Sequence, residues 1–328
     1  MILQARIFKL AKDPEHPGEY QDACQVDAAR GVAVIADGVS SAIFSAQWAN
    51  VLVDAVVADA PDLDDVEAFA AWLQQQRQAW AGRIDTTSLA WFQRAKLPMG
   101  AFSTLLWIHV AEAAGDQPGA FGGFRLRGFA IGDSCLFHLR NGELVRSFPM
   151  QTAAEFQADP LVLGSVDLKR DHLMQFTRLD EFCYPDDLLV LCTDALGEWA
   201  MRQQEAGEPT DWYGYWNMPE ADWQAEITAR RHARHIRYDD TTLVLLRVVA
   251  ETPAAAAPAV DVPAFDTAAA ADPPSDLNID DWSKKVRSVS DQVSEQVEQV
   301  SEQVLRGMKK LKEKALQKYR EKFGPDKK

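Results

Sequence analysis

The stretch VAVIADG, residues 32–38, decides how we interpret the fold, because five consecutive apolar residues run directly into Asp-Gly. An apolar run of this length is typical of a strand that is buried on both faces, and Asp-Gly is a common turn signal. Further apolar, β-rich segments lie at residues 103–110, 124–131, 135–139, 188–193 and 241–249. We therefore expect several strands buried in stacked layers.

Helical segments stand apart from these strands. Residues 45–59 and 63–81 have helical spacing and a content of Ala, Leu and Gln that favours helices. Asn141-Gly142, between CLFHLR and ELVRSF, predicts a two-residue hairpin. Because strands and helices come in blocks and do not alternate, the sequence favours an α+β fold over a doubly wound parallel sheet.

Three segments divide the chain. Residues 1–250 are expected to form one folded domain, and residues 251–279, rich in Ala and Pro, an extended linker. Residues 280–328 are expected to form an amphipathic helix with a basic end. Its apolar positions recur with an 11-residue period, which keeps them on one face of a nearly straight helix. These positions are Val286, Val289, Val293, Val297, Val300, Val304, Met308, Leu311 and Ala315.

Charge and composition exclude several classes of protein. The formal net charge is −15, and 13 of the 34 basic and 8 of the 49 acidic residues lie in 281–328, so that segment carries +5 and residues 1–280 carry −20. Such an acidic body argues against nucleic-acid binding. No apolar run is long enough to span a membrane, and the N-terminus lacks the pattern of a signal peptide. Four widely spaced cysteines without a C-x-x-C pair are expected to be buried free thiols, and we expect a cytoplasmic protein.

Aspartates fall repeatedly at strand ends. Asp37, Asp133 and Asp194 each end an apolar run, Asp239 and Asp240 begin another, and Asp22 precedes a short apolar segment. Taken singly, each favours a turn or a cap. Taken together, carboxylates that converge at one end of a sheet system would repel one another unless a cation neutralised them. Oxygen ligands of this kind suit Mg²⁺ or Mn²⁺.

Five motifs, in order over residues 1 to about 250, resemble those of the metal-dependent protein phosphatases of the PP2C type. The motifs are GEYQDAC followed by VAVIADGVSSA, GAFSTLL at 100–106, FAIGDS at 129–134, LLVLCTDALGEW at 188–199 and DDTTLVLL at 239–246. The resemblance implies a bacterial-type protein serine/threonine phosphatase. It also implies a central antiparallel β-sandwich with helices packed outside each sheet, in four layers.

The resemblance further implies a centre of two Mg²⁺ or Mn²⁺ ions, or three. Asp37 would bridge two ions and Gly38 would supply its carbonyl oxygen. Asp194 and Asp239 would complete the ligand set, while Asp22 would hold water. Asp133, with Asp194, matches a third and weaker metal position. Asp240 is expected to contact the ligand residues rather than the ions themselves.

In this reading Asp37, Asp194 and Asp239 are catalytic through a water that the ions activate for in-line attack on phosphorus, on a phosphoserine or phosphothreonine of a phosphoprotein substrate. If the carboxylates lay far apart, or paired with arginines instead, this interpretation would fail.

Three features depart from the family pattern. Val39-Ser40-Ser41 stands where some members have a histidine, which leaves the general acid unassigned. Ala195 follows Asp194 where glycine is usual, and alanine would be strained there if the backbone needed a positive φ. No arginine near Asp22 is placed to hold a substrate phosphate; Arg6, Lys9 and Lys12 are the candidates.

Other interpretations stay open. The departures would also suit a catalytically weak or inactive phosphatase-like module that binds partners through its tail. The 280–323 helix would dock on a partner or self-associate, with membrane-surface contact a weaker option, or it would fold back on the acidic body. We expect His232 and His235 to lie on a basic helical face rather than at the metal ions, and the aromatic residues of 207–223 to pack against the body.

Overall fold

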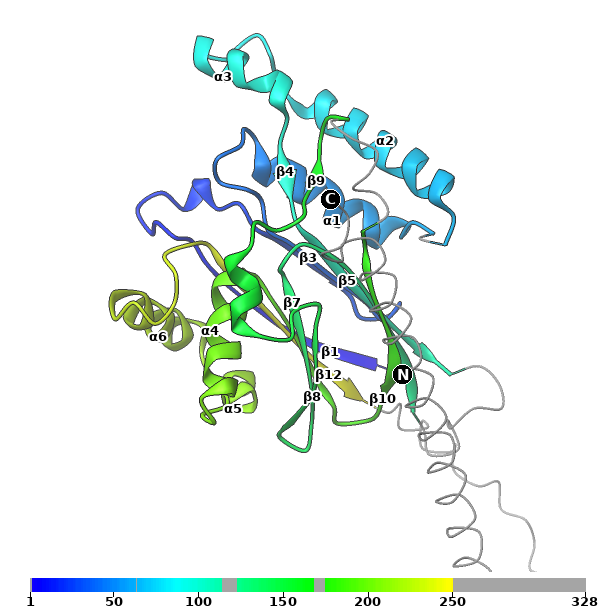
Figure 1. Cartoon of the computed structure of the whole chain (residues 1–328), viewed down its shortest axis with the longest axis vertical. Helices are drawn as coiled ribbons and strands as arrows, with labels where there is room; N and C mark the ends of the chain where they lie inside the picture. Colours follow the sequence, from blue (N-terminus) through cyan, green and yellow to red (C-terminus); the bar gives the residue numbers. More distant parts are fainter. Residues whose placement is uncertain (1, 63, 114–122, 168–174, 250–328) are drawn as a thin grey trace, which may run out of the picture. The chain divides into compact units, whose positions relative to one another are not determined.

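The computed structural model describes residues 2–62, 64–113, 123–167 and 175–249 (Figure 1). The linker expected at 251–279 and the helix expected at 280–328 lie outside the described residues, so both stay predictions. Within the described residues, no helix is long and apolar enough to cross a membrane.

Two five-stranded antiparallel sheets form the centre of the fold. In spatial order, the first sheet contains β1 (Ile2–Leu10), β12 (Thr241–Val249), β11 (Leu188–Cys192), β7 (Cys135–Arg140) and β8 (Glu143–Phe148). The second contains β10 (Thr177–Cys183), β6 (Phe124–Ile131), β5 (Leu105–Glu112), β3 (Val32–Ala36) and β2 (Ala23–Asp27). A short pair joins β4 (Phe102–Ser103) to β9 (Leu163–Gly164).

Helices cover the outer face of each sheet (Figure 1). The second sheet carries α1 (Ser45–Ala58) and α2 (Val66–Arg83), followed in the chain by the short α3 (Trp91–Lys96) and the 3-10 turn η2 (Leu97–Met99). The first sheet carries α4 (Asp194–Glu205), α5 (Trp212–Asn217) and α6 (Glu220–His232). Two further 3-10 turns are η1 (Pro17–Glu19) and η4 (Ala153–Gln157). The order is therefore helices, sheet, sheet, helices.

Three separate apolar cores hold the four layers together. The core between the sheets includes Ile35, Leu106, Leu136, Leu191 and Val244. The core under α1 and α2 includes Val34, Trp48, Leu52, Leu73 and Trp107. The core under α4 to α6 includes Phe137, Val190, Trp199, Trp223 and Leu245. Strands such as β3 and β11 are buried on both faces because alternate side chains enter two different cores, which explains their unbroken apolar sequence and confirms the α+β sandwich.

The hairpin predicted at Asn141-Gly142 is present. Arg140 pairs with Glu143, which leaves a two-residue turn, and both turn residues have positive φ (54° and 85°). One predicted strand is interrupted: residues 103–110 divide into β4 and β5 at Thr104. The break lets Ser103 and Thr104 turn their polar groups to the loop that follows β3.

Strand register brings distant parts of the chain to one end of the sandwich. In the second sheet, the last residue of β3 pairs with the first of β2 (Ala36 with Ala23), and Ile131 at the end of β6 pairs with Leu105 at the start of β5. In the first sheet, Cys192 at the end of β11 pairs with Leu243 near the start of β12 and with Cys135 at the start of β7. The residues just outside these strand ends include all the aspartates singled out above.

Candidate metal centre

Asp37 is fixed through its backbone by the segment between β4 and β5. Its carbonyl oxygen accepts hydrogen bonds from Ser103 Oγ at 2.8 Å and from the Thr104 N–H at 2.9 Å. Its own N–H donates to Thr104 Oγ1 at 3.0 Å. Ser134, directly after Asp133, lies 2.9 Å from the same Thr104 hydroxyl. Two of the sequence motifs therefore converge on the residue that follows β3.

Gly38 stands where no larger residue fits. A Cβ atom at this position would lie 2.7 Å from the carbonyl oxygen of Gln21 and 3.0 Å from the backbone of Ser45. Both neighbours are backbone atoms, which cannot move as a side chain can. The glycine thus permits a close approach between the Asp37 loop, the Asp22 loop and the start of α1.

Asp22 is buried, with 3% of its surface exposed. Its Oδ2 atom accepts hydrogen bonds from Thr242 Oγ1 at 2.7 Å and Thr193 Oγ1 at 3.1 Å, so β12 and the end of β11 both hold it. Its Oδ1 atom is buried without a hydrogen-bond partner. Burial, opposed by the Thr242 hydrogen bond, and the charges of Asp240 and Asp194 raise the pKa of Asp22 to about 8.

Asp133 begins the crossing from β6 in one sheet to β7 in the other, and it is buried. Gly132 before it has φ of 100°, a conformation that suits glycine, and a Cβ there would lie 2.5 Å from the Thr104 side chain. Burial, together with the charge of Asp194, raises the pKa of Asp133 to about 7.

Asp194 is the first residue of α4. Its Oδ2 atom accepts a hydrogen bond from Arg237 Nη2 at 2.8 Å, whereas its Oδ1 atom is buried and has no hydrogen-bond partner. The strain considered at Ala195 does not occur: this residue is the second of α4, with right-handed helical backbone, and its side chain is buried in the core under the helix. Asp194 is therefore not displaced by the alanine.

Asp239 and Asp240 have different surroundings. The Asp239 side chain is 41% exposed and its Oδ1 atom lies 3.8 Å from Lys12 Nζ. Asp240 is buried and accepts hydrogen bonds from the N–H groups of Lys12 at 2.7 Å and Gln21 at 2.8 Å. Asp240 thus connects the loops that carry Lys12 and Asp22, and its role relative to the predicted ligands stays a prediction.

The negative charges of four other aspartates affect the pKa of Asp37. Burial raises its pKa well above the usual 3.8, and the negative charges of Asp22, Asp194, Asp239 and Asp133 raise it further. Five chain segments therefore contribute acidic side chains to one electrostatic environment. Within the described residues, Asp22, Asp37 and Asp133 have no ion pair, so Arg237 and Lys12 offset this charge only in part.

The donor set fits a hard divalent cation, which binds carboxylate and carbonyl oxygens. The unpartnered buried oxygens of Asp22 and Asp194 are the kind of atom that such an ion satisfies, because a buried polar atom without a partner is costly. As placed, however, no three His, Cys, Asp or Glu side chains among the described residues could hold a metal ion together. The ligand roles of the individual aspartates therefore stay predictions.

Two arginines were missed by sequence reasoning. Arg231, in the last turn of α6, is buried and donates to the carbonyl oxygens of Leu10 (3.1 Å), Ala11 (2.8 Å) and Asp239 (2.6 Å). Arg237 lies outside the helix and pairs with Asp194, so one of the three aspartates predicted to be catalytic does pair with an arginine, whereas among the described residues Asp37 and Asp239 do not. The basic sequence ARRHARHIRYDD could have predicted acidic partners for both arginines, since arginines near a cluster of acidic residues commonly pair with them.

The three candidates for holding a substrate phosphate are separated by their contacts. Arg6 donates to the Met218 carbonyl at 2.9 Å and stacks over Phe8, which gives it a structural role. Lys9 lies over the Tyr20 ring. Lys12 alone of the three lies beside an aspartate of the cluster, with its Nζ 2.7 Å from Ser40 Oγ.

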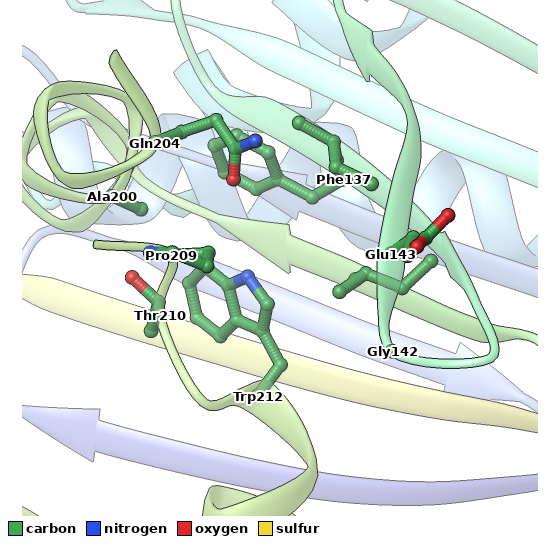
Figure 2. Close-up of a pocket in the computed structure, with 10 residues that line it drawn as sticks. Phe137, Gly142, Glu143, Ala200, Gln204, Pro209, Thr210 and Trp212 are labelled. Atoms are coloured by element: carbon green, nitrogen blue, oxygen red, sulfur yellow. The ribbon is translucent and has the colours of Figure 1, made fainter. Parts of the chain in front are cut away.

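The aromatic residues of 207–223 pack against the body, as predicted. Trp212, Tyr215 and Trp223 are buried in the core under α4 to α6, and Trp212 stacks on Phe137 of β7. Beside them is a cavity of about 290 Å³, bordered by Phe137, Gln204 and Trp212 (Figure 2). Glu143 is the one ionisable side chain of this cavity, and none of the clustered aspartates lines it.

Two facing antiparallel sheets between helical layers, with acidic side chains gathered at one end of the strands, define this chain as a four-layer α+β sandwich with a candidate cation site. The family model described as "Protein phosphatase 2C" matches residues 18–220. The chain belongs to the protein phosphatase 2C family.

Solved structures of low sequence identity are similar to it. The catalytic domain of the serine/threonine phosphatase PstP, in complex with two manganese ions, is 20% identical, with a TM-score of 0.47 and coverage of 76% of this chain and 99% of that one. Stp1 from Staphylococcus aureus is 13% identical (TM-score 0.47, coverage 76% and 96%), and PppA from Pseudomonas aeruginosa is 18% identical (TM-score 0.46, coverage 75% and 98%). No curated protein matches the chain.

Proposed function

We propose that this protein hydrolyses phosphoserine or phosphothreonine on proteins at a centre of two or three Mg²⁺ or Mn²⁺ ions. The family supports a phosphatase, and the observation that carries the proposal is the gathering of aspartates at one end of the sandwich, where Asp22 Oδ1 and Asp194 Oδ1 are buried without hydrogen-bond partners. The raised pKa of Asp37 agrees with this arrangement. Such a cluster is costly in the folded protein unless cations bind to it. The two manganese ions of PstP support the same kind of ion here.

Bound divalent ions would supply an activated water and would stabilise negative charge on the phosphoryl oxygens. The residues that would hold them are Asp37, with the Gly38 carbonyl, Asp194 and Asp239, together with Asp133 for a further ion. Asp22 would orient water, because its Oδ2 is fixed by Thr193 and Thr242 while its Oδ1 is free of protein partners.

Lys12 is the candidate among the three basic residues for holding substrate phosphate. Its side chain is 25% exposed, and Asp240 accepts a hydrogen bond from its backbone N–H, which positions the lysine beside the carboxylates. The Lys12 ammonium group contacts Ser40 and, at the longer distance of 3.8 Å, Asp239. A Lys12→Met variant is expected to raise KM for a phosphopeptide with a smaller effect on kcat, because ground-state contacts to phosphate affect binding first.

The proposed activity is tested with a phosphothreonine peptide and Mn²⁺, comparing the wild-type chain with the Asp37→Asn variant. Phosphate release that requires both the metal and Asp37 supports the proposal. Equal inactivity of both chains across Mg²⁺, Mn²⁺ and several phosphopeptides contradicts it. Calorimetric titration with Mn²⁺ gives an independent answer, since binding must weaken in the variant.

The segment 280–328 remains proposed as a helix that self-associates or docks on a partner. Its apolar stripe and the net charge of +5 over residues 281–328 support this role. Sedimentation of the full chain and of a chain that ends at residue 279 tests it, and identical association states at equal concentration contradict self-association.

A further inference from the structure

Arg237 is held at the edge of the acidic cluster by two carboxylates of α4. Its Nη2 atom lies 2.8 Å from Asp194 Oδ2, and its Nε atom lies 2.7 Å from Glu198 Oε2. Asp194 and Glu198 are four residues apart and therefore lie on the same side of the helix. The planar guanidinium spans both, which a lysine could not do in the same geometry.

The two partners of Arg237 are unequal. Glu198 is 6% exposed at its side chain, and Gln157 Nε2 donates to its other carboxylate oxygen at 3.0 Å, so its position is fixed from both sides. The contact of Arg237 Nε with Glu198 Oε2 is an ion pair without hydrogen-bond geometry, and Asp194 likewise has a buried oxygen, Oδ1, without a hydrogen-bond partner. Asp194 differs from Glu198 in that it belongs to the acidic cluster. Glu198 is thus suited to be a permanent anchor, while Asp194 is the partner that a divalent ion would compete for.

The exposure of the Arg237 guanidinium and the charges near it indicate that it can reach an anionic ligand. The Arg237 side chain is 43% exposed, and it also lies within the electrostatic influence of Asp133 and Asp239. An arginine anchored through Nε still has its Nη groups available, and arginine binds phosphate in a two-pronged geometry. No other arginine among the described residues forms an ion pair with an aspartate of the cluster.

We propose that Arg237 is an exchangeable counter-ion of the metal centre: it neutralises Asp194 before metal binds, stays anchored to Glu198 when the ion takes Asp194, and then donates to the phosphoryl oxygens of the substrate. This inference rests on the proposed function and adds to it a second basic residue, besides Lys12, that holds the substrate phosphate. It also explains why an arginine at Asp194 is compatible with metal binding, since one carboxylate oxygen stays free and the other is exchangeable.

The test measures two affinities that this role moves in opposite directions. In the Arg237→Met variant, Mn²⁺ titrated by calorimetry is expected to bind about tenfold more tightly, because the competing cation is gone; tenfold corresponds to about 1.4 kcal/mol. Orthophosphate titrated into the Mn²⁺-loaded variant is expected to bind about tenfold more weakly. Arg83→Met, which removes a comparable surface contact to Asp54 (3.4 Å) and the same charge, is the matched control and is expected to change neither affinity.

A Glu198→Gln variant separates anchoring from simple charge. With the anchor lost, Arg237 has Asp194 as its remaining partner, so Mn²⁺ binding is expected to weaken while the arginine is still present. Thermal unfolding of each variant, with and without Mn²⁺, establishes that the chains are folded and shows whether the ion stabilises Arg237→Met more than the wild type.

The outcomes distinguish the two proposals. If the wild-type chain does not bind Mn²⁺, or if binding does not depend on Asp37, the proposed function fails. If wild type binds Mn²⁺ through Asp37 but Arg237→Met leaves both affinities unchanged, or weakens both, Arg237 is a structural residue and this inference alone is overturned.

Discussion

Thr242 Oγ1 donates a hydrogen bond to Asp22 Oδ2 at 2.7 Å, and so joins the last strand of the sandwich to the loop before β2, 220 residues away in sequence. Thr193 Oγ1 donates to the same oxygen and also accepts a hydrogen bond from the Thr242 N–H at 3.1 Å. The three residues form one buried unit. The other carboxylate oxygen of Asp22, Oδ1, is buried and has no hydrogen-bond partner among the described residues.

Replacing Thr242 by valine tests this unit. The change keeps the shape of the side chain and removes the hydroxyl, so a buried carboxylate loses a donor, which costs about 1–3 kcal/mol of unfolding free energy. Since the Thr242 hydrogen bond lowers the pKa of Asp22, the pKa is expected to rise above about 8 in the variant. Urea unfolding measures the first effect and carbon-13 NMR of the carboxyl group the second. Unchanged values for both would show that the hydroxyl does not support Asp22.

Arg231→Met is expected to be strongly destabilising. The guanidinium satisfies the carbonyl oxygens of Leu10, Ala11 and Asp239, and methionine would leave buried acceptors without donors, at a cost of about 3 kcal/mol or more. Because one of these carbonyls belongs to Asp239, activity is expected to fall beyond the loss of folded protein.

The neighbouring Arg230→Met is the control. Arg230 forms an i,i+4 contact with Glu226 at 2.7 Å and lies over the Trp199 ring, contacts worth about 1 kcal/mol in partly exposed positions. Equal loss of stability in the two variants, measured by urea unfolding, would contradict the structural role of Arg231.

Gly38→Ala is expected to damage the site through packing. The new methyl group would lie 2.7 Å from the Gln21 carbonyl oxygen, and relieving that overlap must move the Asp37 loop, at a cost of about 1–3 kcal/mol. Gly82→Ala, in the exposed last turn of α2 with nothing within 4 Å of the new atom, should instead stabilise by up to about 1 kcal/mol. Thermal unfolding and phosphatase assays of both variants check the pair. A neutral effect at Gly38 would refute the close approach.

The sequence predicted much of this arrangement and missed the rest for identifiable reasons. The strands at 32–36, 124–131 and 241–249 were predicted with the correct bounds because residues buried on both faces are continuously apolar. By contrast, β1 and β10 were missed, since ILQARIFKL and TRLDEFC mix charged and apolar residues as edge strands do. That the aspartates lie at one end of the sandwich follows from strand register, because each one closely follows or precedes a strand that ends there. That Arg237 reaches α4 depends on a loop conformation that no spacing rule predicts.

Asp37→Asn is expected to separate stability from activity. In the absence of added metal, folding raises the pKa of Asp37 far above the value of the unfolded chain, which costs stability at neutral pH; asparagine removes this cost, so the thermal midpoint of the variant should rise above that of the wild type. Phosphatase activity should fall by about 100-fold or more, because a bridging carboxylate would be lost. Excess Mn²⁺ should stabilise the wild type more than the variant. A variant that is both less stable without metal and equally stabilised by Mn²⁺ would contradict the repulsion argument.

His138 carries the last prediction. Its side chain is fully buried in β7, with Nδ1 2.7 Å from Glu181 of the other sheet and Nε2 2.8 Å from Asp187. Arg146 and Arg140 contact the same two carboxylates. Burial lowers the pKa of His138, but the hydrogen bonds to Asp187 and Glu181 outweigh burial and raise it above 6.5. For Glu181 and Asp187, burial raises the pKa, and the hydrogen bonds to His138 outweigh it, so both pKa values are lowered.

The pH dependence follows from these directions. A histidine whose pKa is higher in the folded state contributes stability that is complete below pH 6.5 and is lost as the pH rises through the folded pKa. The lowered carboxylate pKa values contribute stability that is lost toward acid, so this network stabilises most between about pH 4.5 and 6.5. Urea unfolding at pH 5.5 and 8.5 should therefore show a loss toward pH 8.5 that is smaller in His138→Gln. His109→Gln is the opposite control: burial lowers the pKa of His109, so that histidine destabilises the fold toward acid. The same pH slope in wild type and His138→Gln would show that His138 is not charged between its two carboxylates.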